Sequence, residues 1–81
     1  MPYIRPETRI SLANYRRASS AGELNYTITR MVLQYLQDQG LNYQTCNDIV
    51  GALDNAKDEF RRRVQHPYED SRCGENGDVY P

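Results

Sequence analysis

The chain has 81 residues, a net charge of −1 and 38% hydrophobic residues, which suits one small domain. A core of this size stabilises a fold by only about 3–5 kcal/mol, so a second copy is expected to add stability. The charge argues against a globally basic nucleic-acid binder, and no apolar run reaches the ~20 residues of a membrane span.

The first twenty residues carry the least regular pattern. Pro2 and Pro6 disfavour helix in the residues before them, and Pro6 followed by Glu7 suits the start of a helix. The apolar residues that follow show no clear period. We therefore expect a weak N-terminal helix over about residues 7–19, ended by the Ser-Ser-Ala-Gly break at 19–22.

The next segment, residues 22–39, has the clearest helical pattern. Ser20 or Gly22 can cap its start, and Gly40 suits the left-handed position that follows a helix. Six apolar residues recur at the spacing of one helix face: Leu24, Ile28, Met31, Val32, Tyr35 and Leu36.

A third helix is predicted over residues 45–66. Asn42 or Thr45 can cap its start, and Pro67 is expected to end it at about His66. Alternating steps of three and four residues predict a packing seam, formed by Cys46, Ile49, Leu53, Ala56 and Phe60 and widened by Val50 and Val64.

The predicted fold class is all-α. About five residues join the second and third helices, and so short a connection favours antiparallel neighbours. We expect an antiparallel helical hairpin of about residues 22–39 and 45–66, with the weak N-terminal helix beside it and an acidic C-terminal arm, all within one domain of residues 1–81.

The arm, residues 67–81, has a net charge of −3 and contains a turn signal at Asn76-Gly77. Acidic and apolar residues in it could dock on an arginine-rich helical surface of the same or a neighbouring subunit, while a disordered tail is the alternative. The candidate docking residues are Tyr68, Asn76, Asp78, Val79 and Tyr80.

Arginine clusters suggest a candidate anion or partner site. Arginines at 61–63 complement the dipole at a helix end, which is a sufficient structural reason for them. Arginine also binds phosphate and tyrosine stacks on bases, so a nucleotide-like ligand is a functional alternative. The candidate residues are Arg16, Arg17, Arg30, Arg61, Arg62, Tyr26 and Tyr43.

The sequence contains no recognisable catalytic set, so we expect no enzyme activity and no cofactor. His66 is the only histidine, which argues against a metal site. Cys46 and Cys73 are too few for a secreted disulfide scaffold, and we expect a cytoplasmic protein.

Four blocks carry a resemblance: "GELNYTITR" (22–30), "LNYQTCNDIVGAL" (41–53), "FRRRV" with "PYED" (60–70) and "ENGDVY" (75–80). Together they resemble a family of small uncharacterised proteins of bacteriophages and prophages. The resemblance covers about residues 22–80 and departs in the first helix. It implies a phage-derived cytoplasmic protein with an ordered tail, and it implies no known reaction.

The leading functional hypothesis is a non-enzymatic helical module that forms a dimer or larger homo-oligomer and binds a host or phage protein. The alternative is a sequestering protein that holds a small anionic, nucleotide-like ligand between subunits. A nucleic-acid-associated protein that uses the arginine clusters is the second alternative, and the net charge argues against it. No membrane partner is expected.

Overall fold

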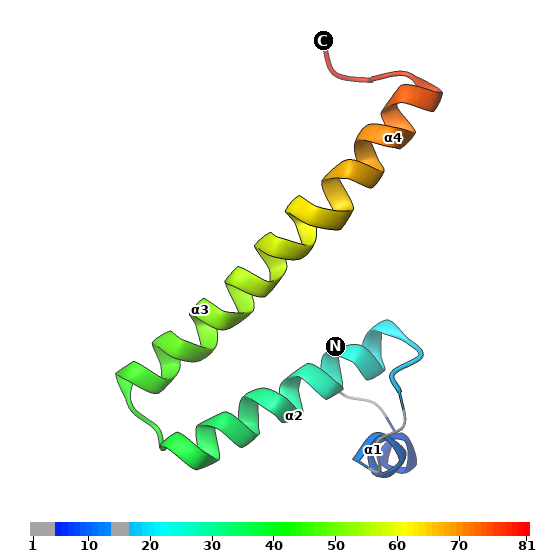
Figure 1. The fold of residues 1–81 in the computed structure, drawn as a ribbon. Helices are drawn as coiled ribbons and strands as arrows, with labels where there is room; N and C mark the ends of the chain where they lie inside the picture. Colours follow the sequence, from blue (N-terminus) through cyan, green and yellow to red (C-terminus); the bar gives the residue numbers. More distant parts are fainter. Residues whose placement is uncertain (1–4, 14–16) are drawn as a thin grey trace. The chain divides into compact units, whose positions relative to one another are not determined.

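The computed structural model describes residues 5–13 and 17–81 (Figure 1). These residues contain helices and no strand, so the all-α prediction is confirmed. The elements are α1 (Pro6–Ala13), α2 (Ala21–Gln39), α3 (Tyr43–Phe60), the π-helical turn η1 (Arg61–Gln65) and α4 (His66–Asn76). The chain divides into two compact units, residues 1–46 and residues 47–81.

Helix α1 begins as expected and is shorter than expected. Pro6 occupies its first position and Glu7 lies in its first turn, where a negative charge suits the helix dipole. The helix ends at Ala13, whereas the sequence predicted about 7–19, and residues 17–20 are not helical. Within the unit of residues 1–46, α1 lies against α2.

Both ends of α2 follow the sequence signals. The Ser20 hydroxyl oxygen accepts the backbone N–H of Glu23 at 3.1 Å, and the Glu23 carboxylate accepts the backbone N–H of Ser19 at 3.0 Å. At the other end, Gly40 has a φ of 84° and donates its N–H to the carbonyl oxygen of Leu36 at 2.8 Å. A positive φ is accessible to glycine at little cost, so the helix stops where Gly40 stands.

Residues 40–42 connect α2 to α3, which gives the connectivity of a helical hairpin. Helix α3 begins at Tyr43, two residues earlier than predicted. The side-chain oxygen of Asn42 accepts the backbone N–H of Thr45 at 2.9 Å, so Asn42 supplies the cap. Thr45 lies inside the first turn and is only 3% exposed.

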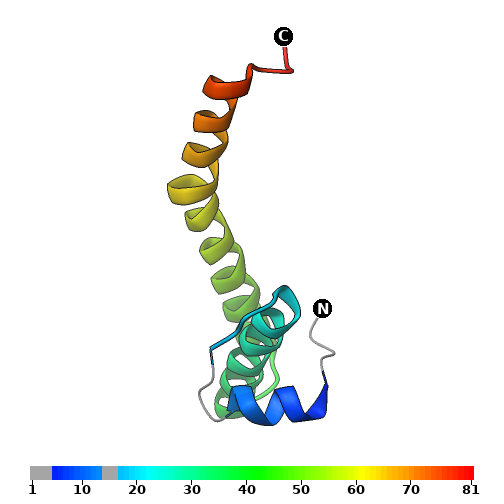
Figure 2. The same ribbon diagram turned by 90° about the vertical axis from the view of Figure 1, so that its right-hand side faces the viewer.

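The helix expected to end at His66 continues for ten more residues as α4 (Figure 2). Pro67 is accommodated by the π-helical turn before it, in which the N–H of His66 donates to the carbonyl oxygen of Arg61, five residues earlier. Proline lacks an N–H, and its ring crowds the carbonyl four residues back. Widening the preceding turn removes that conflict, so the expected arm of residues 67–81 shortens to residues 77–81.

The predicted seam of α3 is not buried. Leu53 is 42% exposed and Phe60 is 60% exposed, while Ile49 is half-buried. The physical reason lies within the unit of residues 47–81, which is one continuous helix followed by a short tail. One helix cannot cover its own apolar face, so the 3-4 spacing indicates a surface without specifying what packs on it.

The end of α4 is defined by Gly77, which has a φ of 86° and donates its N–H to the carbonyl oxygen of Cys73 at 2.8 Å. The Asn76-Gly77 signal therefore marks the end of a helix. Beyond it, an Asp78 carboxylate oxygen accepts the backbone N–H of Tyr80 at 2.9 Å, which fixes a local turn.

Candidate interaction surface

The long helix of residues 47–76 carries one row of apolar side chains, which we call the apolar stripe. Four of its members are well exposed: Leu53 at 42%, Phe60 at 60%, Val64 at 52% and Tyr68 at 64%. Ile49, which is half-buried, completes the stripe at its N-terminal end. Large apolar side chains gathered on one face mark a surface suited to binding another protein.

The π-helical turn keeps the stripe continuous. Phe60, Val64 and Tyr68 are four residues apart, and in a regular α-helix each such step drifts by about 40° around the axis because a turn holds 3.6 residues. A π-helical turn, closed by a hydrogen bond between residues five apart, contains more residues than an α-helical turn. Each residue therefore rotates less around the axis, which offsets this drift. The widened turn at residues 61–65 therefore keeps Val64 and Tyr68 in line with Phe60.

A charged cluster lies beside the stripe at the same level. One carboxylate oxygen of Glu59 accepts a hydrogen bond from Arg62 and the other accepts one from Arg63, both at 2.8 Å. The Arg63 guanidinium, followed by that of Arg62, lowers the pKa of the Glu59 carboxyl below its ordinary value. All three side chains are more than half exposed, so these ion pairs contribute little to stability. Their hydrogen bonds hold the charged side chains in defined positions.

The predicted anion-site residues come from both units. Arg17, Tyr26, Arg30 and Tyr43 belong to residues 1–46, Arg61 and Arg62 belong to residues 47–81, and Arg16 lies outside the described residues. Arg61 and Arg62 are neighbours on the π-helical turn, and the hydrogen bond to Glu59 already engages Arg62. The assignment of these residues to an anion site stays a prediction.

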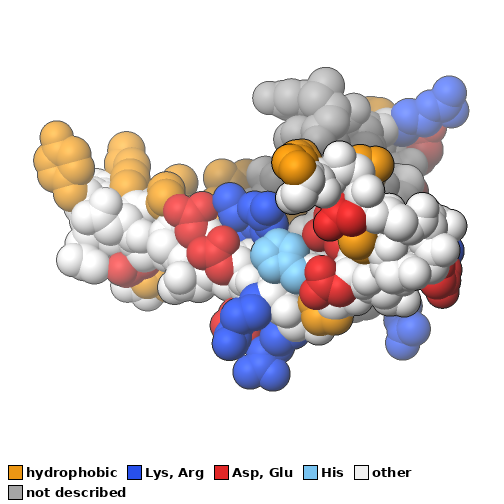
Figure 3. Space-filling view, turned by 90° about the horizontal axis from the view of Figure 1, so that it is seen from above, with side chains coloured by type: hydrophobic (Ala, Val, Ile, Leu, Met, Phe, Trp, Pro, Cys, Tyr) orange, Lys and Arg blue, Asp and Glu red, His pale blue; other side chains and the backbone are white. Residues whose placement is uncertain are grey.

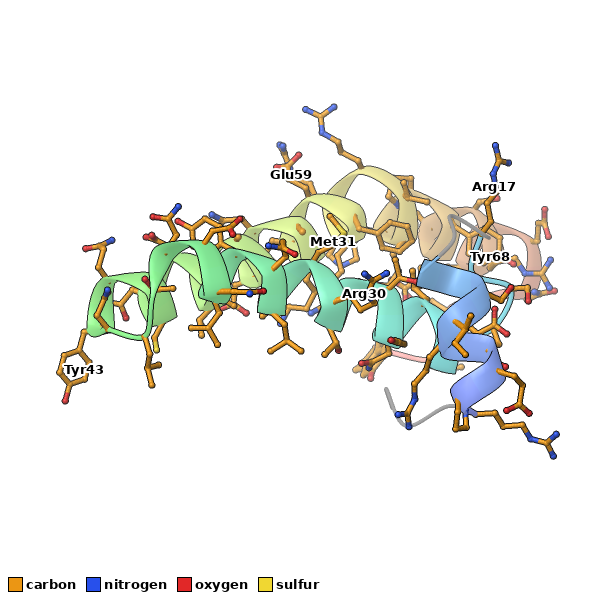
Figure 4. The ribbon with its side chains drawn as sticks, turned by 90° about the horizontal axis from the view of Figure 1, so that it is seen from below. Arg17, Arg30, Met31, Tyr43, Glu59 and Tyr68 are labelled. Carbon is orange, nitrogen blue, oxygen red and sulfur yellow. The ribbon has the colours of Figure 1, made fainter. Side chains whose placement is uncertain are left out.

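Tyr43 is the most exposed of the predicted tyrosines at 91%, whereas Tyr26 is half-buried on α2. Figure 4 shows the Tyr43 ring projecting from the start of α3, away from the helix. Its neighbours Leu41 and Cys46 line a shallow apolar hollow together with Asn42. The hollow is open to solvent, and the only sequence signal for it is the group of apolar residues near the start of α3.

The predicted docking residues of the arm are placed in two different ways. Tyr68 lies on α4 and belongs to the apolar stripe, and Asn76 is the last residue of that helix. Asp78, Val79 and Tyr80 lie in the short tail, where Val79 is 92% exposed and Tyr80 is 80% exposed. Figure 3 shows, on the face it presents, hydrophobic side chains reaching the surface among charged ones.

Sequence reasoning missed the continuation through Pro67, although a signal for it was present. Proline is favoured in the first turn of a helix, and Glu69 follows it where an acidic residue suits the dipole. The proline that was expected to end one helix thus lies in the first turn of α4. With a widened turn before Pro67, the predicted helix of residues 45–66 and the helical residues after it form one continuous surface.

Comparison with known proteins gives a family and no function. The family model described as "Domain of unknown function (DUF6899)" matches residues 1–79. The chain belongs to this family. The DUF6899 match includes residues 1–21, which the resemblance based on the four sequence blocks had left out. No curated protein and no solved structure matches the chain.

Within residues 5–13 and 17–81, none of the helices combines the length and the apolar character that crossing a bilayer requires.

Proposed function

We propose that this DUF6899 protein is a non-enzymatic helical interaction module that works as a homo-oligomer. One observation carries the proposal: the unit of residues 47–81 is a single helix with an exposed apolar stripe, and no second element within that unit covers it. A helix with one apolar face gains its stability mainly by packing that face against another element. A second protein surface would supply that element.

The extent of the stripe supports association. From Ile49 to Tyr68 it runs for about 28 Å along the helix, at 1.5 Å per residue. Apolar burial contributes about 25 cal/mol per Å², whereas association costs about 4–15 kcal/mol in lost freedom and ordering. Isolated contacts would not overcome that cost, but a row of large side chains over several turns can.

The proposal includes a phage origin and a site of action in the host cytoplasm, both of which rest on the resemblance of the four sequence blocks. A host or phage protein would be the partner of the oligomer. Val79 and Tyr80 support a contact of this kind, because both are at least 80% exposed and lie just beyond the helix that carries the stripe. Apolar and aromatic side chains of this sort often anchor interfaces.

The alternative function is sequestration of a small nucleotide-like anion. The observation in its favour is the 91% exposure of Tyr43, whose ring is available to stack on a base. The hydrogen bond from Arg62 to Glu59 counts against it, because that guanidinium would have to exchange partners to hold a phosphate.

Solution mass tests the leading proposal directly. Light scattering over a dilution series should give a mass that is a multiple of the 9.4 kDa chain and falls only at low concentration. A mass of 9.4 kDa throughout would contradict self-association. A thermal-shift panel of mononucleotides and dinucleotides then addresses the alternative, for which a saturable rise in melting temperature is expected.

A further inference from the structure

We propose that the apolar stripe binds the same stripe of a second copy, with the two long helices antiparallel and the twofold axis near Phe60. This inference rests on the proposed self-association and adds the surface, the occupant and the direction. In a twofold interface the same patch serves both subunits and must complement itself. The stripe and its charged surroundings meet that requirement in one orientation only.

Charge along the helix changes sign at Phe60. Residues 52–59, on its N-terminal side, carry three acids and one base, whereas residues 61–68 carry three arginines and no acid. An antiparallel pair centred on Phe60 sets each acidic segment alongside the basic segment of the other copy. A parallel pair would set acid beside acid and the arginines of one copy beside those of the other, which is unfavourable.

Individual positions follow the same rule. In a pair symmetric about Phe60, a residue n positions before it is level with the residue n positions after it in the other copy. Glu59 is then level with Arg61 of the second copy, at the edge of the interface. Asp58 and Arg62 are also level with each other, but each lies about 160° around the helix from Phe60, on the face turned away from the second copy. One like-charged pair, Lys57 with Arg63, is brought to the same level, but Arg63 keeps its hydrogen bond to Glu59 beside it.

The apolar side chains also agree with this arrangement. Phe60 of one copy meets Phe60 of the other near the twofold axis. Val64 is level with Ala56 of the second copy, so a larger side chain faces a smaller one. The π-helical turn is essential here, because it holds Val64 and Tyr68 in line with Phe60. Without it, the half of the stripe that follows Phe60 would turn away from the half that precedes it.

The native cysteines provide the test, because Cys46 is exposed, Cys73 is partly exposed, both are free, and they lie on either side of Phe60. Cys73→Ser leaves Cys46 for a spin label, and Cys46→Ser leaves Cys73. Antiparallel pairing predicts about 40 Å between the two labels in each single-cysteine dimer, at 1.5 Å of rise per residue. A mixture of the two labelled variants should add a short distance, near the interaxial spacing of about 10 Å lengthened by the label arms.

Each other outcome has a distinct meaning. A short distance in both single-cysteine dimers would show parallel pairing and overturn this inference, while self-association would stand. A dimer that shows neither the antiparallel nor the parallel distances would place the contact on another surface. That result would also overturn this inference and leave self-association standing. A monomer without dipolar coupling would overturn the inference and the proposed function together.

A matched pair of substitutions checks the surface. Phe60→Asp places a charge at the proposed axis, and Asn55→Asp places the same charge on the same helix away from the stripe. We expect the first to raise the dimer dissociation constant at least a hundredfold and the second to change it less than threefold. Circular dichroism establishes that both variants remain helical, and equal effects of the two would overturn the assignment of the stripe.

Discussion

The backbone N–H of His66 donates to the carbonyl oxygen of Arg61, five residues earlier, directly before Pro67. This wide turn lets one helix pass a residue that normally interrupts it. Its consequence is a stripe that continues from α3 into α4. The exception to helical geometry and the proposed binding surface are thus one feature of the chain.

Pro67→Ala should separate the stability of the helix from its ability to associate. Alanine restores the missing N–H, so the turn is expected to relax to α-helix and to stabilise the long helix by about 1 kcal/mol, less than the ~3 kcal/mol cost of an unrelieved interior proline. Val64 and Tyr68 would then rotate away from Phe60. At a concentration low enough to keep both proteins monomeric, circular dichroism should show a higher melting temperature for Pro67→Ala. At higher concentration, light scattering should show weaker self-association.

A lower helix content in Pro67→Ala would contradict this account, since it would mean that proline does not cause the widened turn. The substitution Gln65→Ala serves as a control within the same segment. It removes an exposed polar side chain and leaves Pro67 in place.

Gly51→Ala should stabilise α3 without affecting association. In the described structure nothing lies within 4 Å of where a Cβ at Gly51 would stand, and helical spacing places this residue opposite the apolar stripe. Alanine favours a helix over glycine by about 1 kcal/mol. Thermal unfolding should show a gain of about that size.

Gly74→Ala, on α4, is the matched comparison because its surroundings are equally open. Both substitutions should raise the melting temperature and leave the solution mass unchanged. A loss of stability or of association in Gly51→Ala alone would reveal a close helix crossing at Gly51, which the antiparallel arrangement on the stripe does not contain.

Local signals and tertiary packing differ in how far the sequence specifies them. Gly40 and Ser20 were recognisable as helix boundaries because each acts through atoms within four residues of itself. The burial of Leu53 and Phe60 was wrongly expected, since a 3-4 period identifies an apolar face without identifying its neighbour. Pro67 was misjudged because its effect depends on whether the backbone of the preceding turn widens. The pattern of side chains in the sequence does not specify that backbone geometry.

Ser20→Ala should shorten α2 from its start. The hydroxyl oxygen of Ser20 accepts the N–H of Glu23, and loss of such a cap costs about 1 kcal/mol. Ser71→Ala makes the same chemical change in the exposed interior of α4, where alanine is the better helix former. We expect Ser20→Ala to lower the melting temperature and Ser71→Ala to leave it without a decrease. Equal decreases in the two variants would show that the cap is not responsible.

Glu59→Gln should alter how stability depends on pH. Because Arg63 and then Arg62 lower the pKa of Glu59 in the folded chain, its contribution is present above the ordinary glutamate pKa. That contribution is lost as the pH falls through the lowered pKa of the folded state. The wild-type helix should therefore lose stability over this acidic range by more than the glutamine variant does.

Thermal melts followed by circular dichroism between neutral pH and pH ~3 would measure the stability of both proteins. Taking the difference between the two cancels the contribution from the titration of the other acids, which both proteins share. Arg63→Gln should reproduce most of the effect, because Arg63 makes the larger contribution to lowering the pKa of Glu59. Since the Glu59 carboxylate is exposed, the difference should shrink at high salt. A difference that is unchanged by salt, or that grows as the pH rises above neutral, would show that the pair with Arg63 is not its source.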